Sequence, residues 1–163
     1  MQPKELFSGV VLVSPLIMPD SAIANPINNF LAKIFSQIYP SFTGFDGLDL
    51  SLITTDPYWL EVKRKDNLGY HGKYIAGHSH VLNIEVAKLR RRYKEMKTPF
   101  LMMISERDRL TDPKASLAFF IRASSEDKKV EYFNQGLHNF FIEKEDIRRK
   151  AISLTIKWII NRI

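Results

Sequence analysis

Three short strand-like runs, separated by helical patterns, constrain most strongly what this 163-residue chain can fold into. Residues 9–14 (GVVLVS) and 99–105 (PFLMMIS) carry apolar side chains on both faces, which is typical of buried parallel strands. Residues 128–133 (KKVEYF) alternate as a strand does. Strands joined through helices form a parallel sheet with right-handed crossovers. The sequence therefore predicts an α/β fold in which helices flank a parallel sheet.

The first helical pattern follows the first strand. Asn25 is a good N-cap, Pro26 suits the first helical turn, and Pro40 ends the pattern. Residues 41–72 are rich in Asp, Gly, Thr and Ser and predict loops and short helical turns. The helix carries an apolar stripe that suits core packing: Ile27, Phe30, Leu31, Ile34 and Ile38.

Three more helices are predicted. The first covers about residues 80–97 and has basic residues opposite its apolar side. The second has Asp112 as N-cap and Pro113 as its first residue, and extends to about Ser124. The last covers residues 145–161, with a predicted buried face of Ile147, Ala151, Leu154, Trp158 and Ile159.

Composition indicates a soluble globular chain with one domain over residues 1–163. Hydrophobic residues make up 45% and charged residues 26% of the sequence, which is ordinary for a folded domain. The absence of cysteine excludes disulfides, thiolate nucleophiles and cysteine metal sites. No apolar run is long enough to span a bilayer, and the N-terminus lacks the apolar core of a signal peptide. We therefore expect a cytoplasmic protein.

The net charge is positive, because 24 Lys and Arg residues stand against 18 Asp and Glu residues. The densest basic run is typical of a solvated helix face, and it also suits peripheral contact with an anionic membrane surface. No aromatic interleaving or nucleic-acid motif accompanies it, so we expect no nucleic-acid partner. The run consists of Lys88, Arg90, Arg91, Arg92, Lys94 and Lys97.

Asp108 and His138 are the strongest candidate site residues. Asp108 follows the second predicted strand and His138 follows the third. The carboxyl ends of parallel strands meet at one edge of the sheet, so an acid and a base could meet there. Each residue also has a simpler interpretation: Asp108 could pair with Arg107 or Arg109 in a surface turn, and His138 could bind loop backbone.

Ser79 lies in GHSHV, which resembles the beginning of a Gly-x-Ser-x-Gly nucleophile elbow, and Asp108 and His138 follow it in the order of a hydrolase triad. Two features oppose this interpretation. The fifth elbow position is Val81, which would crowd the turn, and no buried strand precedes Gly77. We therefore expect Ser79 to act as a helix N-cap.

Three histidines raise the question of a metal site. His71, His78 and His80 lie close together in sequence, but no carboxylate motif or known ligand spacing accompanies them. We therefore expect polar loop residues and neither a metal nor another cofactor.

The chain resembles the C-terminal half of monoglyceride lipases, in the serine aminopeptidase-like branch of the α/β-hydrolases. The motifs that carry the resemblance are Ser-Pro-Leu after the first strand, Asp-Arg-Leu after the second and Gly-Leu-His after the third. By this resemblance Asp108 and His138 correspond to the aspartate and histidine of the triad. Residues from about 20 to 97 correspond to the cap over the acyl-binding tunnel, so the apolar stripe of residues 27–38 suits an acyl chain as well as core packing. The matching segments are FSGVVLVSPLI, LAKIFSQIYPSF, TTDPYW, TPFLMMISERDRLTDPKAS and VEYFNQGLHNFFIEKED.

The resemblance implies hydrolysis of a lipid ester, such as a monoacylglycerol, by a serine, His138 and Asp108. In the family, the nucleophile elbow and oxyanion loop precede the segment that corresponds to FSGVVLVSP. We therefore expect a partial α/β-hydrolase fold that is inactive by itself. Such a chain could come from a truncated gene model, it could be a split product, or it could be a non-catalytic remnant. The alternative function is that of a binding or interaction protein.

Overall fold

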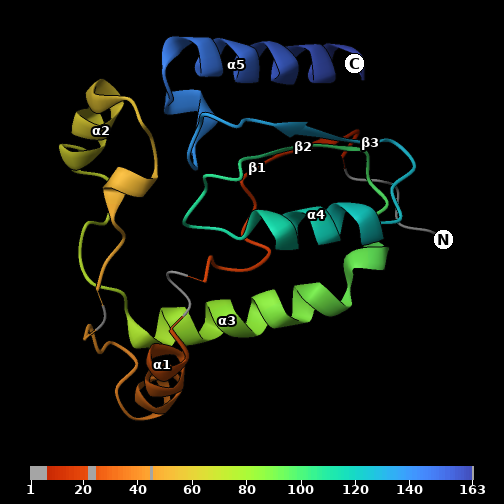
Figure 1. The fold of residues 1–163 in the computed structure, drawn as a ribbon. Coiled ribbons are helices and arrows are strands. Elements are labelled where there is room, and N and C mark those ends of the chain that lie inside the picture. The colour runs from red at the N-terminus through yellow and green to blue at the C-terminus, as the bar shows by residue number, and fades with distance from the viewer. Residues whose placement is uncertain (1–6, 22–24, 45, 163) are drawn as a thin grey trace.

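The computed structural model describes residues 7–21, 25–44 and 46–162, and its centre is a parallel sheet (Figure 1). The strands are β1 (Val10–Val13), β2 (Phe100–Ile104) and β3 (Lys128–Tyr132), in the order β1-β2-β3. Both pairings are parallel, and β2 pairs with a strand on either side. The predicted α/β fold with a parallel sheet is therefore confirmed.

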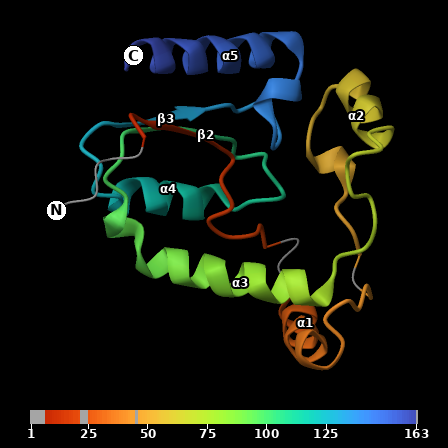
Figure 2. The same cartoon turned by 180° about the vertical axis from the view of Figure 1, so that it is seen from behind.

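The central strand β2 is buried along its whole length. Helix α4 (Pro113–Arg122) lies on one face of the sheet and α5 (Glu145–Ile160) on the other, as both views show (Figures 1 and 2). Alternate residues of β2 point to the two faces, because side chains alternate along a strand. Burial of a large apolar side chain contributes about 1.5–3 kcal/mol, so these two layers stabilise the sheet.

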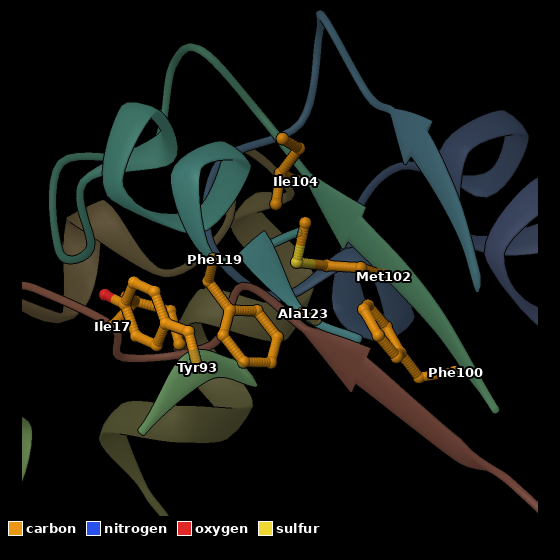
Figure 3. Close-up of a cluster of buried hydrophobic side chains, with 7 residues drawn as sticks. All are labelled: Ile17, Tyr93, Phe100, Met102, Ile104, Phe119 and Ala123. Atoms are coloured by element: carbon orange, nitrogen blue, oxygen red, sulfur yellow. The ribbon is translucent and has the colours of Figure 1, made fainter. Parts of the chain in front are cut away.

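The two faces of the sheet carry separate core clusters. Towards α4, Phe119 contacts Tyr93 and Phe100, with ring centroids 5.2 and 5.6 Å apart (Figure 3). Towards α5, Phe133 stacks on Phe140 at 4.4 Å. The second cluster is completed by Leu101, Met103, Ile147 and Ala151.

The predicted caps of two helices are confirmed. Helix α1 (Pro26–Ile38) begins after Asn25, whose side chain accepts hydrogen bonds from the N–H groups of Ile27 and Asn28. Helix α4 begins after Asp112, whose side chain accepts from the Lys114 N–H at 2.8 Å.

The segment predicted to hold loops and short turns, residues 41–72, contains a 3₁₀ turn η1 (Leu50–Leu52) and one helix, α2 (Pro57–Arg64). Asp56 caps α2 by accepting from the Tyr58 N–H at 2.9 Å. Asp56 and Pro57 repeat the signal that starts α4, so the sequence did carry a sign of this helix.

Helix α3 (Ala76–Arg91) begins before the predicted start, and the prediction that Ser79 is its N-cap is wrong. The Ser79 N–H already donates to the Ile75 carbonyl within the helix. The first helical N–H groups find backbone acceptors elsewhere: Ala76 donates to the Phe42 carbonyl and Gly77 to the Pro40 carbonyl, both at 2.9 Å. Because long-range partners satisfy these donors, the helix needs no side-chain cap. It is followed by the 3₁₀ turn η2 (Tyr93–Glu95).

Several apolar side chains of the stripes predicted on α1 and α5 are exposed. Ile159 of α5 is 47% exposed, so its place in the predicted buried face is wrong, whereas Ile147 and Ala151 are buried. On α1 only Ala32 is buried. None of the helices in the described ranges is long and apolar enough to cross a bilayer. Most of the predicted α1 stripe faces outwards: Ile27, Phe30, Ile34 and Ile38.

Strand β1 lies at the edge of the sheet, and within the described residues no strand pairs with its outer side. Exposed strand edges promote association, and α5 adds exposed Ile152, Ile156 and Ile160. We therefore expect the chain expressed alone to oligomerise or to depend on a complementary fragment, as measured by light scattering. A monodisperse monomer at high concentration would instead indicate a self-sufficient small fold.

Candidate active site

Asp108 lies in the loop after β2, and its carboxylate is fixed by neighbouring donors. Its side chain is 2% exposed. Oδ1 accepts hydrogen bonds from the N–H groups of Leu110 at 2.8 Å and Thr111 at 3.1 Å. Oδ2 accepts from the Thr111 hydroxyl at 2.7 Å. All these donors belong to the loop that carries Asp108, so this loop alone orients the carboxylate.

His138 lies in the loop after β3 and meets this carboxylate. Its Nδ1 lies 2.9 Å from Asp108 Oδ2, within the range expected of a triad pair. The acceptor is an anionic oxygen, so Nδ1 carries the proton and donates it, which leaves Nε2 as the basic nitrogen. The imidazole is 28% exposed, so the edge of the ring can reach a ligand.

The electrostatics keep Asp108 ionised. Burial by itself raises the pKa of Asp108, but hydrogen bonds from His138, Thr111 and the Leu110 N–H outweigh burial, so the pKa lies below its ordinary value of 3.8.

The simpler interpretation of Asp108 as a surface turn residue does not fit. In the described part of the chain no ion pair joins Asp108 to Arg107 or Arg109. The Arg107 guanidinium instead donates to the Gln135 carbonyl at 3.3 Å. His138, likewise, does more than bind backbone, because its ring contacts Asp108.

Ser105 joins the two loops, and sequence reasoning missed it. Its buried hydroxyl donates to the Gly136 carbonyl at 2.6 Å and accepts from the Arg107 N–H at 3.0 Å. Its place at the end of a buried strand was the available signal, but its partner lies 31 residues away.

A cavity of about 850 Å³ opens beside His138. Loop residues beyond the carboxyl ends of the strands, including Leu16 after β1 and Thr111 after β2, form part of its wall. Further wall residues, including Leu52, Ile53 and Leu82, come from the helical insertion, the segment with α1, α2 and α3 that lies between β1 and β2. The cavity thus lies between the acid-base pair and the helical insertion.

Ser79 also lines this cavity, but its backbone is not that of an elbow. It lies in the first turn of α3, and no strand runs into that turn. A nucleophile elbow holds its serine in a strained turn after a strand. Ser79 does not have the positive φ of a strained backbone; among the described non-glycine residues, Ser14 at the end of β1 has one, at 42°.

The three clustered histidines do not gather around a common centre. His71 Nε2 lies 2.8 Å from the Asp66 carbonyl oxygen. Across the described ranges, no group of three or more His, Cys, Asp or Glu side chains is arranged to hold a metal ion.

A profile of the serine aminopeptidase S33 family matches residues 1–145, which is most of the sequence. The chain belongs to the serine aminopeptidase S33 family. Membership agrees with the parallel sheet and with the expected resemblance to the C-terminal half of monoglyceride lipases.

The related sequences in this family include lipases. Mouse monoglyceride lipase is 25% identical over 158 residues, which is 96% of this chain and 52% of the lipase. The monoacylglycerol lipase of Mycolicibacterium smegmatis is 23% identical over 157 residues, covering 96% of this chain and 55% of that protein. The S33 chain therefore spans about half the length of the curated relatives that it matches.

Solved structures with the same fold include monoacylglycerol lipases. The crystal structure from Paleococcus ferrophilus matches with a TM-score of 0.88 and 20% identity, covering 98% of this chain and 61% of that one. A soluble variant of the Saccharomyces cerevisiae monoglyceride lipase, in complex with a substrate analogue, matches with a TM-score of 0.82 and 21% identity, covering 96% and 56%. At these identities the likeness establishes the fold of this S33 chain.

The lowered pKa of Asp108 predicts how the stability of the S33 chain changes with pH. A carboxyl group with a lowered pKa in the folded state stabilises that state above its unfolded pKa, and the contribution is lost as pH falls through the folded pKa. We expect the free energy of unfolding to fall below about pH 4, and Asp108→Asn to weaken this dependence.

At neutral pH, Asp108→Asn should destabilise the fold by roughly 1–3 kcal/mol in urea unfolding, because buried donors lose an anionic acceptor. Glu106→Gln is the control, since Glu106 is an exposed carboxylate in the same loop. Equal pH dependence in the two variants would contradict the geometry of the pair.

Proposed function

We propose that this chain supplies the acid and base of a serine hydrolase that cleaves lipid esters of the monoacylglycerol class. The observation that carries the proposal is the hydrogen bond between His138 Nδ1 and the buried carboxylate of Asp108, beside a cavity. Family membership supports the hydrolase class. The monoglyceride lipases among the relatives support the substrate class.

In the proposed reaction a serine hydroxyl attacks the ester carbonyl. Nε2 of His138 takes the hydroxyl proton and returns it to the departing glycerol, which leaves the acyl group on the serine. Nε2 then takes a proton from water, which attacks the acyl-serine, and returns that proton to the serine as the fatty acid leaves. In both steps Asp108 orients the ring and stabilises its cation. Two backbone N–H groups would bind the oxyanion. The proposed reaction requires no metal and no cofactor.

We propose that the serine and the oxyanion donors come from a segment outside these 163 residues. The chain spans about half of its curated relatives, and Ser79 lies in a helical turn rather than in an elbow. In the alternative function, a non-catalytic protein binds lipid in the same cavity without cleaving it. Nε2 of His138 then has no chemical role.

Residues from about 20 to 97 would act as the cap of this site, within one domain that extends over residues 1–163. Leu52, Ile53 and Leu82 of this segment line the cavity and suit an acyl chain. Asn28 and Asn29 line it as well and suit the polar end of an ester lipid.

Peripheral contact with a membrane surface is the proposed route to such a substrate for a cytoplasmic protein. Helix α1 presents Ile27 at 68% and Ile38 at 77% exposure. Helix α3 packs against α1 and carries the basic residues Lys88, Arg90 and Arg91. Exposed apolar side chains and surface cations each favour binding to an anionic lipid surface.

The catalytic proposal predicts that the purified chain does not label with a fluorophosphonate probe, because such probes require an activated serine. Addition of a complementary segment that carries a Gly-x-Ser-x-Gly elbow should restore labelling, and His138→Ala should abolish the restored signal. Stoichiometric labelling of the chain alone, lost in Ser79→Ala, would overturn the assignment. Lipid binding with no labelling, even after complementation, would favour the non-catalytic alternative.

The membrane proposal predicts co-sedimentation with anionic vesicles. Ile27→Ser and Ile38→Ser should each lower the partition coefficient by roughly tenfold, since each removes about 1.5 kcal/mol of apolar burial. Ile121→Ser on α4, which is 67% exposed and distant in sequence, serves as the matched control. If all three variants partition alike, α1 is not the contact surface.

A further inference from the structure

Glu143 is a buried carboxylate to which the proposed reaction gives no role. Its side chain is 0% exposed, and it directly follows the 3₁₀ turn η3 (Phe140–Ile142). A charge removed from water is costly unless strong donors surround it. The position of these donors therefore indicates what the carboxylate holds in place.

The donors come from two segments that are far apart in sequence. The Leu137 N–H donates to Glu143 Oε1 at 2.7 Å. The Thr55 N–H lies between both carboxylate oxygens, at 3.1 and 3.0 Å, and the Thr55 hydroxyl donates to Oε2 at 2.5 Å. Leu137 immediately precedes His138, and Thr55 precedes α2. One carboxylate thus ties the loop of the base to the helical insertion.

Further hydrogen bonds join the same two segments. The Ile53 carbonyl accepts from the N–H groups of His138 at 3.2 Å and Asn139 at 2.9 Å. The Thr54 hydroxyl donates to the Ile142 carbonyl at 2.7 Å. The backbone of His138 is therefore held by the insertion, while its ring is held by Asp108 after β2.

We propose that Glu143 is a positioning residue for His138. By binding the Leu137 N–H and Thr55 together, it fixes the backbone that carries the imidazole and keeps Nδ1 within reach of Asp108. The segment 53–55 is then mechanically coupled to the base, so a shift of the insertion at α2 would shift His138. This inference deepens the proposed function and rests on it, since it assigns Glu143 to the proposed base.

Two substitutions test the contact. Glu143→Gln keeps the side-chain volume but replaces one acceptor oxygen with an NH₂ group, which would face an N–H donor. Thr55→Val removes the hydroxyl and keeps the backbone N–H. Hydrogen exchange by mass spectrometry should show about tenfold or faster exchange in peptides covering 50–56 and 134–142 for both variants, with residues 100–104 unchanged.

The controls are Thr55→Ser, which retains the hydroxyl, and Glu126→Gln, which makes the same change at an exposed carboxylate. Both should exchange like the original chain.

The position of the base is measured separately, as the rate at which diethyl pyrocarbonate modifies His138, with exposed His71 and His78 as internal references. Glu143→Gln should raise the His138 rate several-fold and leave the reference rates unchanged. An unchanged His138 rate, or faster exchange that extends equally to β2, would overturn the proposal and leave Glu143 a general stabiliser. Neither measurement depends on esterase activity, so failure of the proposed function would not be mistaken for failure of this contact.

Discussion

The parallel pairing of β1 and β3 on either side of the fully buried strand β2 is the constraint on which the site depends. Because parallel strands end at the same edge, the loops that follow β2 and β3 emerge together, and Asp108 meets His138. Helices α4 and α5 cover the two faces and exclude water from β2 (Figures 1 and 2). The geometry of the acid-base pair is thus a consequence of sheet topology.

The features that the sequence predicted well depend on local chemistry. A run of apolar residues with both faces buried indicated β2, and Asn25 and Asp112 indicated their helix starts because a cap bonds within its own turn. Asp108 and His138 could be placed at one edge because strand ends define that edge. The catalytic role of the pair remains a proposal that geometry supports.

Apart from α2, whose start signal is local, the features that sequence reasoning missed depend on partners distant along the chain. Helix α3 starts early because the Pro40 and Phe42 carbonyls accept its first N–H groups, which no local pattern records. The exposure of Ile159 reflects where α5 meets the sheet. Glu143 resembles any surface glutamate in the sequence, and only the fold brings Thr55 to it.

The most direct test of the account is NMR of the chain with selectively ¹⁵N-labelled histidine, because the central claim concerns one hydrogen bond. We expect a protected Nδ1–H resonance of His138 that disappears in Asp108→Asn and persists in Glu106→Gln. A His138 ring whose proton resides on Nε2, or an Nδ1–H signal that is indifferent to Asp108→Asn, would contradict the acid-base pair.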